Sequence, residues 1–236
     1  MPPLLRVLTG AGLGPRRACF RLIADGKVTV NGETVTQSTR DVDPAVDVIE
    51  ADGRRVAAPE PHVYVKLNKP AGVLSAVTDA RGRPTVTGLL PSEYRGLRLF
   101  PVGRLDMDST GLVLMTNDGG LAYRLMHPSY GYEKEYHVVL KSPLTEADIR
   151  ELVEGVLLDG QRTAPARVAR FSEGSALRYA VTLAEGRKRQ VRRMLASLGK
   201  PPTVLERVRI HTLRLGTLAP GEAAPLSAEE LEALRA

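Results

Sequence analysis

Two short segments near the N-terminus carry apolar residues at helical intervals. They run from Leu4 to Leu8 and from Arg16 to Ile23, and the glycines and proline of residues 10–15 separate them. Apolar positions three and four residues apart line one face of an α-helix, whereas Gly and Pro interrupt helices. The pattern therefore predicts two short helices joined by a turn.

The segment that follows changes to a strand-like pattern. β-Branched and polar residues alternate from Lys27 to Val35 around Asn31-Gly32, which both tolerate the positive φ of a tight hairpin turn. Residues 47–53 predict a further strand and turn. Residues 57–61 contain two prolines and no apolar period, so we place a domain boundary there, between residues 1–60 and residues 61–236.

The chain beyond this boundary mixes strands with helices. Thr145 with Asp148 and Ser227 with Glu230 each predict a helix start, because a Ser or Thr followed three residues later by an acid can form a capping box. A third helical period covers residues 189–198. The segments that predict strands are residues 63–67, 112–115, 136–140 and 177–183. The pattern indicates an α+β fold, with a small domain ahead of a larger one.

Composition narrows the class of protein. Hydrophobic residues make up 43% of the 236 residues, which is enough for a folded core. No apolar run approaches the roughly 18 residues needed to cross a bilayer, and the N-terminus does not resemble a signal peptide. Cys19 is the single cysteine, and the four histidines lack zinc-like spacing. We expect a cytoplasmic protein without a metal or a membrane segment.

The net charge favours a polyanionic partner. The formal charge is +6 and the pI is about 9.6. Lys and Arg side chains that neutralise phosphates release condensed counterions, which favours binding to nucleic acid. Charge alone does not decide the matter, because many basic proteins bind no nucleic acid.

The most polar loop of the chain lies between two apolar segments, in residues 101–119. It contains Arg104, Asp106, Asp108 and Thr110. Loops at strand ends often carry chemistry, but Asp and Ser also build ordinary turns. On residue types alone, a loop-structuring role is favoured over a site, and Asp108 in particular is expected to be a turn or cap residue.

The N-terminal segment of residues 14–32 resembles the S4 RNA-binding domain, although Pro15 stands where that family usually has Ser. The resemblance implies a helix pair that faces RNA, backed by a small sheet. Without it, the basic residues could equally form a solvated helix face. A dinucleotide-binding loop is disfavoured, because its third glycine would fall at Pro15. The cations expected to contact RNA are Arg16, Arg17, Arg21 and Lys27.

The sequence Gly103-Arg-Leu-Asp106, followed by Ser109-Thr-Gly-Leu, resembles the signature of the RsuA/RluB family of ribosomal RNA pseudouridine synthases. Residues 66–72, 127–136 and 185–194 resemble further segments of that family, in the same order, although Lys188 and Val191 replace its more usual Asn and Ile. The resemblance implies a catalytic domain built on a mixed, mainly antiparallel β-sheet flanked by helices. It also implies uridine isomerisation in ribosomal RNA without a cofactor.

The same resemblance implies a role for several residues. Asp106 would be the catalytic nucleophile or base, Tyr136 would stack on the target base, Arg192 would pair with Asp106, and Arg104 would fill the gap left by the displaced nucleotide. A buried Asp that faces an Arg stays ionised, because the opposite charge offsets its desolvation. Residue types leave open whether Asp106 forms an adduct with the sugar or the base, or removes a proton from the ribose.

A second basic cluster lies between residues 187 and 193. Five cations within seven residues repel one another unless anions or acids meet them, so we expect RNA contact. Lys69 could contact phosphate or simply flank a strand. The further residues expected to bind RNA are Lys69, Arg187, Lys188, Arg189 and Arg193.

Three functional hypotheses remain at this point. The leading one is a monomeric pseudouridine synthase of 23S ribosomal RNA, because residues 127–136 resemble the RluB branch more than the RsuA branch, which would act on 16S RNA. A non-catalytic RNA-binding assembly factor is the second, and intact Asp106, Tyr136 and Arg192 count against it. A methyltransferase with an S4 module would need a cofactor loop that the sequence does not contain.

Overall fold

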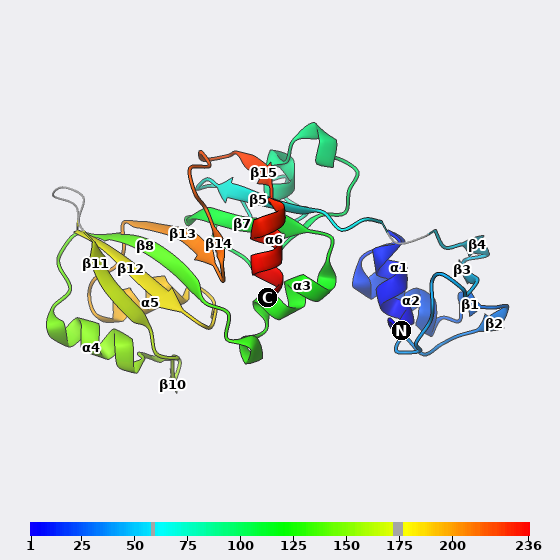
Figure 1. The fold of residues 1–236 in the computed structure, drawn as a ribbon. Helices are drawn as coiled ribbons and strands as arrows, with labels where there is room; N and C mark the ends of the chain where they lie inside the picture. Colours follow the sequence, from blue (N-terminus) through cyan, green and yellow to red (C-terminus); the bar gives the residue numbers. More distant parts are fainter. Residues whose placement is uncertain (58–59, 172–176) are drawn as a thin grey trace. The chain divides into compact units, whose positions relative to one another are not determined.

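The computed structural model describes residues 1–57, 60–171 and 177–236, and the chain divides into two compact units, residues 1–62 and residues 63–236 (Figure 1). None of the helices in these described ranges combines the length and apolar character of a membrane-spanning segment.

The smaller unit packs two helices on a four-stranded antiparallel sheet. Asn31 and Gly32 adopt φ angles of 53° and 82°, which closes the predicted hairpin. Pro15 stands at the N-cap of the second helix and gives it no side-chain cap. The sheet order is β2-β1-β3-β4. The elements are α1 (Leu4–Gly10), α2 (Arg16–Ala24), β1 (Val28–Val30), β2 (Glu33–Thr34), β3 (Ile49–Ala51) and β4 (Arg54–Arg55).

The larger unit is built on a nine-stranded sheet. Its main path has the order β11-β12-β8-β13-β7-β5-β15, while β14 pairs with β13 and β6 pairs with β7. All described pairings are antiparallel except that of β13 with β7, so the predicted mixed, mainly antiparallel sheet is confirmed. The strands are β5 (Tyr64–Lys69), β6 (Phe100–Pro101), β7 (Thr110–Thr116), β8 (Lys134–Leu140), β11 (Arg167–Phe171), β12 (Leu177–Leu183), β13 (Val204–Ile210), β14 (Leu213–Arg214) and β15 (Ala223–Pro225).

Helices cover this sheet in two groups (Figure 1). Leu152 of α4 and Met194 of α5 are buried against β8 and β12, whereas Leu125 of α3 and Leu234 of α6 are buried against β7. The helices are α3 (Gly119–Met126), α4 (Glu146–Glu154), α5 (Gln190–Ser197) and α6 (Ala228–Arg235), with 3-10 turns η1 (Val86–Leu89), η2 (Ser92–Tyr94) and η3 (Pro128–Tyr130) and a small hairpin of β9 (Leu157–Leu158) and β10 (Gln161–Arg162).

Both predicted capping boxes are present. The Thr145 hydroxyl accepts from the Asp148 backbone N–H while the Asp148 carboxylate accepts from the Thr145 N–H, and Ser227 and Glu230 do the same at α6. Each box satisfies two backbone donors that would otherwise lack an intrahelical partner.

The sequence analysis missed the central strand β13, the edge strand β11 and helix α3. The segment that forms β13 carries Glu206, Arg207 and Arg209, and charged side chains normally mark exposed loops and surfaces. In the fold, however, Arg207 is buried inside the sheet. The burial of this charge concealed the strand from pattern analysis.

Candidate active site

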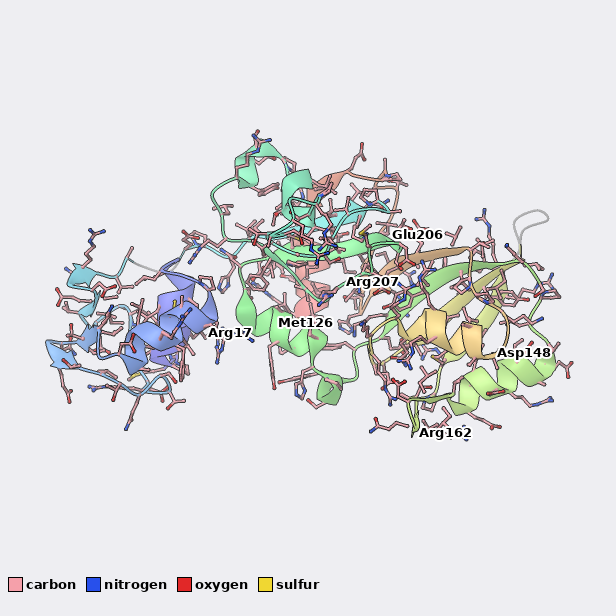
Figure 2. All side chains as sticks on the ribbon, turned by 180° about the vertical axis from the view of Figure 1, so that it is seen from behind. Arg17, Met126, Asp148, Arg162, Glu206 and Arg207 are labelled. Carbon is pink, nitrogen blue, oxygen red and sulfur yellow. The ribbon has the colours of Figure 1, made fainter. Side chains whose placement is uncertain are left out.

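A cleft of about 660 Å³ opens in the larger unit beside the loop that joins β6 to β7. Strands β8 and β13 contribute residues to it, as does the loop before α5. Met126 and Arg207, both labelled in Figure 2, lie on this cleft. The charged and aromatic side chains that line it are Arg104, Asp106, Lys134, Tyr136, Glu185, Arg187, Lys188, Arg189 and Arg207.

Asp106 lies in the tight turn just before β7, with its side chain 30% exposed. Its backbone carbonyl accepts from the Ser109 N–H at 3.1 Å, which closes the turn. The preceding residue, Leu105, exchanges two hydrogen bonds with the buried Ser75 hydroxyl, at 3.0 and 3.1 Å. Ser75 thus anchors the backbone beside Asp106, a role that residue type alone did not indicate.

The arginine pairing differs from the expected one. Arg192 contacts Asp108 rather than Asp106: its Nη2 donates to the Asp108 carbonyl at 2.7 Å, and its Nε lies 3.4 Å from the Asp108 carboxylate. Asp106 forms an ion pair with Arg189, whose Nη1 lies 3.9 Å from Asp106 Oδ2. The turn directs Asp108 and Ser109 toward α5, where Arg192 binds them. Arg192 is not among the residues that line the cleft.

Asp108 links the loop to α5. Arg189 binds its carboxylate with two bonds of 2.9 Å, and these hydrogen bonds, with the charge of Arg192, lower the pKa of Asp108 below its ordinary value. The same pair raises the pKa of Arg189. Asp108 therefore has a structural role, as the sequence indicated, but as an ion-pair acceptor rather than as a helix cap.

Lys69 does not present its charge to solvent, in contrast to the expected phosphate contact. It is 0% exposed at the end of β5, and its Nζ donates to the Pro70 carbonyl at 2.8 Å. Burial lowers the pKa of Lys69 to about 8, against the opposing effect of Asp108 and Asp106. The ammonium group of Lys69 is therefore buried next to the loop that carries Asp106 and Asp108.

Tyr136 is half-buried on β8 and lines the cleft. Its cross-strand partners are Val181 on β12 and Arg207 on β13. Directly opposite residues in an antiparallel pair lie on the same face of a sheet. The tyrosine ring and Arg207 therefore share the face that forms the floor of the cleft. Arg207 and Lys134, two residues before Tyr136, were both missed by the sequence analysis.

Most cations of the basic cluster of residues 187–193 form ion pairs with acids or hydrogen bonds with backbone carbonyls of the protein. Arg187 pairs with Glu185 at 3.4 Å and donates to the Arg162 carbonyl, and Arg193 pairs with Asp159. Lys188 is exposed on the cleft. Arg104 is likewise exposed on the opposite loop. Arg187, Lys188 and Arg189 line the cleft, whereas Arg193 is not among the residues that do so.

The smaller unit has a basic hollow of about 600 Å³ on α2. Arg16, Arg17 and Arg21 line it with Phe20, whose ring is 50% exposed, and Arg17 is labelled in Figure 2. Lys27 is exposed outside this hollow, 3.9 Å from Asp52. Phe20 was missed by the sequence analysis, although a large exposed aromatic beside arginines is a typical feature of nucleic-acid-binding surfaces.

Comparison with known proteins gives a match in each of the two units of the chain. Residues 63–197 match the family model of RNA pseudouridylate synthase, and residues 3–45 match that of the S4 domain. The chain is 39% identical over 239 residues to ribosomal large subunit pseudouridine synthase B of Bacillus subtilis, covering 100% of this chain and 96% of the relative.

Two further comparisons extend over almost the whole chain. An uncharacterized RNA pseudouridine synthase of Mycobacterium tuberculosis is 42% identical over 233 residues, covering 97% of this chain and 91% of the relative. A crystal structure of a pseudouridylate synthase superposes with a TM-score of 0.69 at 31% identity and covers 99% of this chain and 100% of that one. The chain therefore belongs to the RNA pseudouridylate synthase family and carries an N-terminal S4 domain.

Proposed function

We propose that this protein isomerises a specific uridine of large-subunit ribosomal RNA to pseudouridine, with Asp106 as the catalytic carboxylate. The observation that carries the proposal is the position of Asp106 on a cleft that also holds Tyr136 and several cations. The name of the Bacillus subtilis relative supports the large subunit as the target. Small-subunit RNA is the alternative substrate.

The reaction needs a uridine that has left its base stack. In the proposed complex, the uracil enters the cleft, stacks on Tyr136 and places its ribose beside Asp106. The bond between ribose C1′ and base N1 breaks, the base turns, and C5 bonds to C1′. C5 loses its proton and N1 gains one, so atoms and charge balance without an oxidant or an energy source. The cleft retains the detached base during the rotation.

The cations of the cleft suit the handling of the RNA backbone. We assign Arg104 to the space that the displaced nucleotide leaves, and Lys188 to phosphate contact at the rim, because both are exposed. Arg189, held by Asp108, lies 3.9 Å from Asp106 and takes the place proposed for Arg192 as its electrostatic partner. Arg192 instead positions the loop through Asp108 and Ser109.

The S4 domain would enlarge the RNA footprint through Arg16, Arg17 and Arg21, with Lys27 nearby in sequence. Phosphate contacts of this kind fix the position of a protein on RNA without reading the sequence. We further propose that the protein acts as a monomer in the cytoplasm, where ribosomal RNA is made and modified in bacteria such as those of the named relatives.

Pseudouridine mapping tests the proposal. A strain without this protein should lack one pseudouridine of its ribosomal RNA, and the gene for wild-type protein should restore it. Asp106→Asn keeps the size of the side chain and removes its charge, so this variant should fold and bind RNA but restore nothing. An unchanged pseudouridine map with defective ribosomal subunits would support the non-catalytic assembly factor instead.

A further inference from the structure

The floor of the cleft contains a guanidinium whose hydrogen bonds are incomplete. Arg207 is 2% exposed, and its Nε donates to the Leu112 carbonyl at 2.9 Å. Its Nη2 is buried and has no hydrogen-bond partner in the described part of the chain. Buried charged side chains are nearly always paired, because an unpaired buried charge is costly. Arg207 is thus an unsatisfied donor in the wall of a substrate cleft.

Nearby acids do not compensate this charge. Within the described ranges, Arg207 forms no ion pair, and the acids that line the cleft are Asp106 and Glu185. Glu185 is already occupied: it accepts from the Ala164 N–H and from Gln190, and it pairs with Arg187. Asp106 pairs with Arg189. The floor therefore has an excess of positive charge.

A second cation strengthens this excess. Lys134 also lines the cleft and lies two residues before Tyr136, on the same face of β8, because side chains alternate along a strand. Its Nζ donates only to the Tyr132 carbonyl, at 3.1 Å, among the described residues. Burial, and then the charge of Arg207, lower the pKa of Lys134. The charge of Arg207 therefore acts on Lys134, and neither cation has an acid partner in the part of the chain that the structure describes.

The backbone is built to keep Arg207 in this place. Arg207 lies opposite Tyr136 on β8 and opposite Gly111 on β7. A Cβ on Gly111 would lie 2.3 Å from the Arg207 carbonyl oxygen, and Gly111 has a φ of 102°. Only glycine permits this close approach of the two strands. The glycine thus holds β13 against β7 at the residue that faces Tyr136 on β8.

We propose that Arg207, assisted by Lys134, binds the carbonyl oxygens of the uracil ring and stabilises the negative charge of the detached base. This inference rests on the proposed function. When the bond from C1′ to N1 breaks, its electron pair stays with the base and spreads over N1, O2 and O4. A fixed cation in a water-poor site stabilises such charge strongly. A phosphate is a less suitable ligand, because the RNA backbone continues on both sides of it and would have to enter the floor.

The decisive experiment compares thio-substituted substrates. An RNA fragment that contains the mapped target is prepared with uridine, 2-thiouridine or 4-thiouridine at that position, and single-turnover rates are measured with excess enzyme. Sulfur accepts hydrogen bonds more weakly than oxygen, so one of the two substitutions should slow the wild type. Arg207→Gln should lower the rate on uridine by about 100-fold, the effect of losing one donor to a developing anion, and should lose most of its sensitivity to the sulfur.

Two variants keep this test informative. Arg209→Gln removes an arginine of the same strand that pairs with Glu133 and Glu135 and is not among the residues that line the cleft, so it should retain both the rate and the thio effect. Lys134→Gln should show a smaller loss of rate and a reduced thio effect, and it serves if Arg207→Gln does not fold. RNA affinity should remain within about threefold of wild type in all of them, because the phosphate contacts are kept.

Equal thio effects in wild type, Arg207→Gln and Lys134→Gln would overturn the inference, as would a wild-type rate in folded Arg207→Gln. If wild-type protein left the RNA unmodified, the proposed function itself would fail. The binding site is then judged separately, by titrating uridine monophosphate and ribose 5-phosphate into ¹⁵N-labelled protein. A shift of the Arg207 side-chain signal that needs the base supports the site, and identical shifts with both compounds refute it.

Discussion

Replacing Lys69 with methionine should remove a pH-dependent cost of folding. Lys69 is fully buried at the end of β5, and burial lowers its pKa from 10.5 to about 8 in the folded protein. In the unfolded chain the lysine returns to its ordinary pKa. Between these two values, the unfolded protein binds more protons than the folded one.

The sign and the size follow from linkage. Stability rises with pH wherever the unfolded state binds more protons, so the contribution of Lys69 to the free energy of unfolding increases from about pH 8 to about pH 10.5. Each pH unit between the two pKa values corresponds to about 1.4 kcal/mol, so the full increase is about 3 kcal/mol. Below pH 8 both states are protonated, and the cost of burying the ammonium is fully present.

Urea unfolding of wild type and Lys69→Met, at several pH values from 7 to 10.5, measures this effect. Other lysines and tyrosines titrate in both proteins, so the difference between the two unfolding free energies isolates position 69. Loss of the hydrogen bond to the Pro70 carbonyl changes the difference between the two unfolding free energies by the same amount at every pH, so it does not affect the slope. The stability of wild type relative to the variant should rise by about 3 kcal/mol over this range, and a flat difference would refute the description of Lys69 as a buried charge.

Three further predictions concern the loop, the sheet and the S4 domain. Asp108→Asn should lower the free energy of unfolding by about 1 kcal/mol or less, because the carboxylate is half exposed. It should also slow catalysis several-fold, because Arg189 loses the carboxylate that holds it. Urea unfolding and single-turnover rates measure the two effects, and a wild-type rate would show that Arg189 does not need Asp108 to hold it in place. Gly111→Ala should destabilise the larger unit by about 3 kcal/mol or more, because its Cβ would clash with the Arg207 backbone; thermal unfolding checks this, and an unchanged midpoint contradicts it. Changing Arg16, Arg17 and Arg21 together to Gln should reduce the slope of log affinity against log salt by about 2 to 3; an unchanged slope would exclude these arginines from phosphate contact.

Local signals made much of the fold predictable. The two N-terminal helices, the hairpin at Asn31-Gly32 and the capping boxes at Thr145 and Ser227 depend on residues close in sequence, so pattern analysis found them. The central strand β13 escaped because its partners, β7 and β8, are far away in sequence and supply the environment that tolerates a buried arginine. Propensity cannot register such a tertiary effect.

The candidate site was likewise predictable from the sequence only in part. The family resemblance implied that Asp106 and Tyr136 belong to one site, and the structure places both on one cleft although they are separated by 30 residues. The sequence could not determine which arginine meets which carboxylate, because that depends on how one turn directs Asp106 and Asp108 relative to α5. In the fold, Arg189 pairs with both carboxylates, whereas Arg192 pairs with Asp108. Side-chain pairing across two loops is a tertiary property.

The cations of the cleft differ in whether an acid of the protein pairs with them. At the rim, Arg187 and Arg189 pair with acids of the protein, so their charge is partly neutralised before any RNA arrives. At the floor, Arg207 and Lys134 have no acid partner among the described residues, and the protein bears the cost of that burial. Such a cost is explained if a ligand brings the missing negative charge. A base that becomes anionic only when its bond to the ribose breaks would supply that charge at the moment of reaction, so the floor would favour the transition state over the bound substrate.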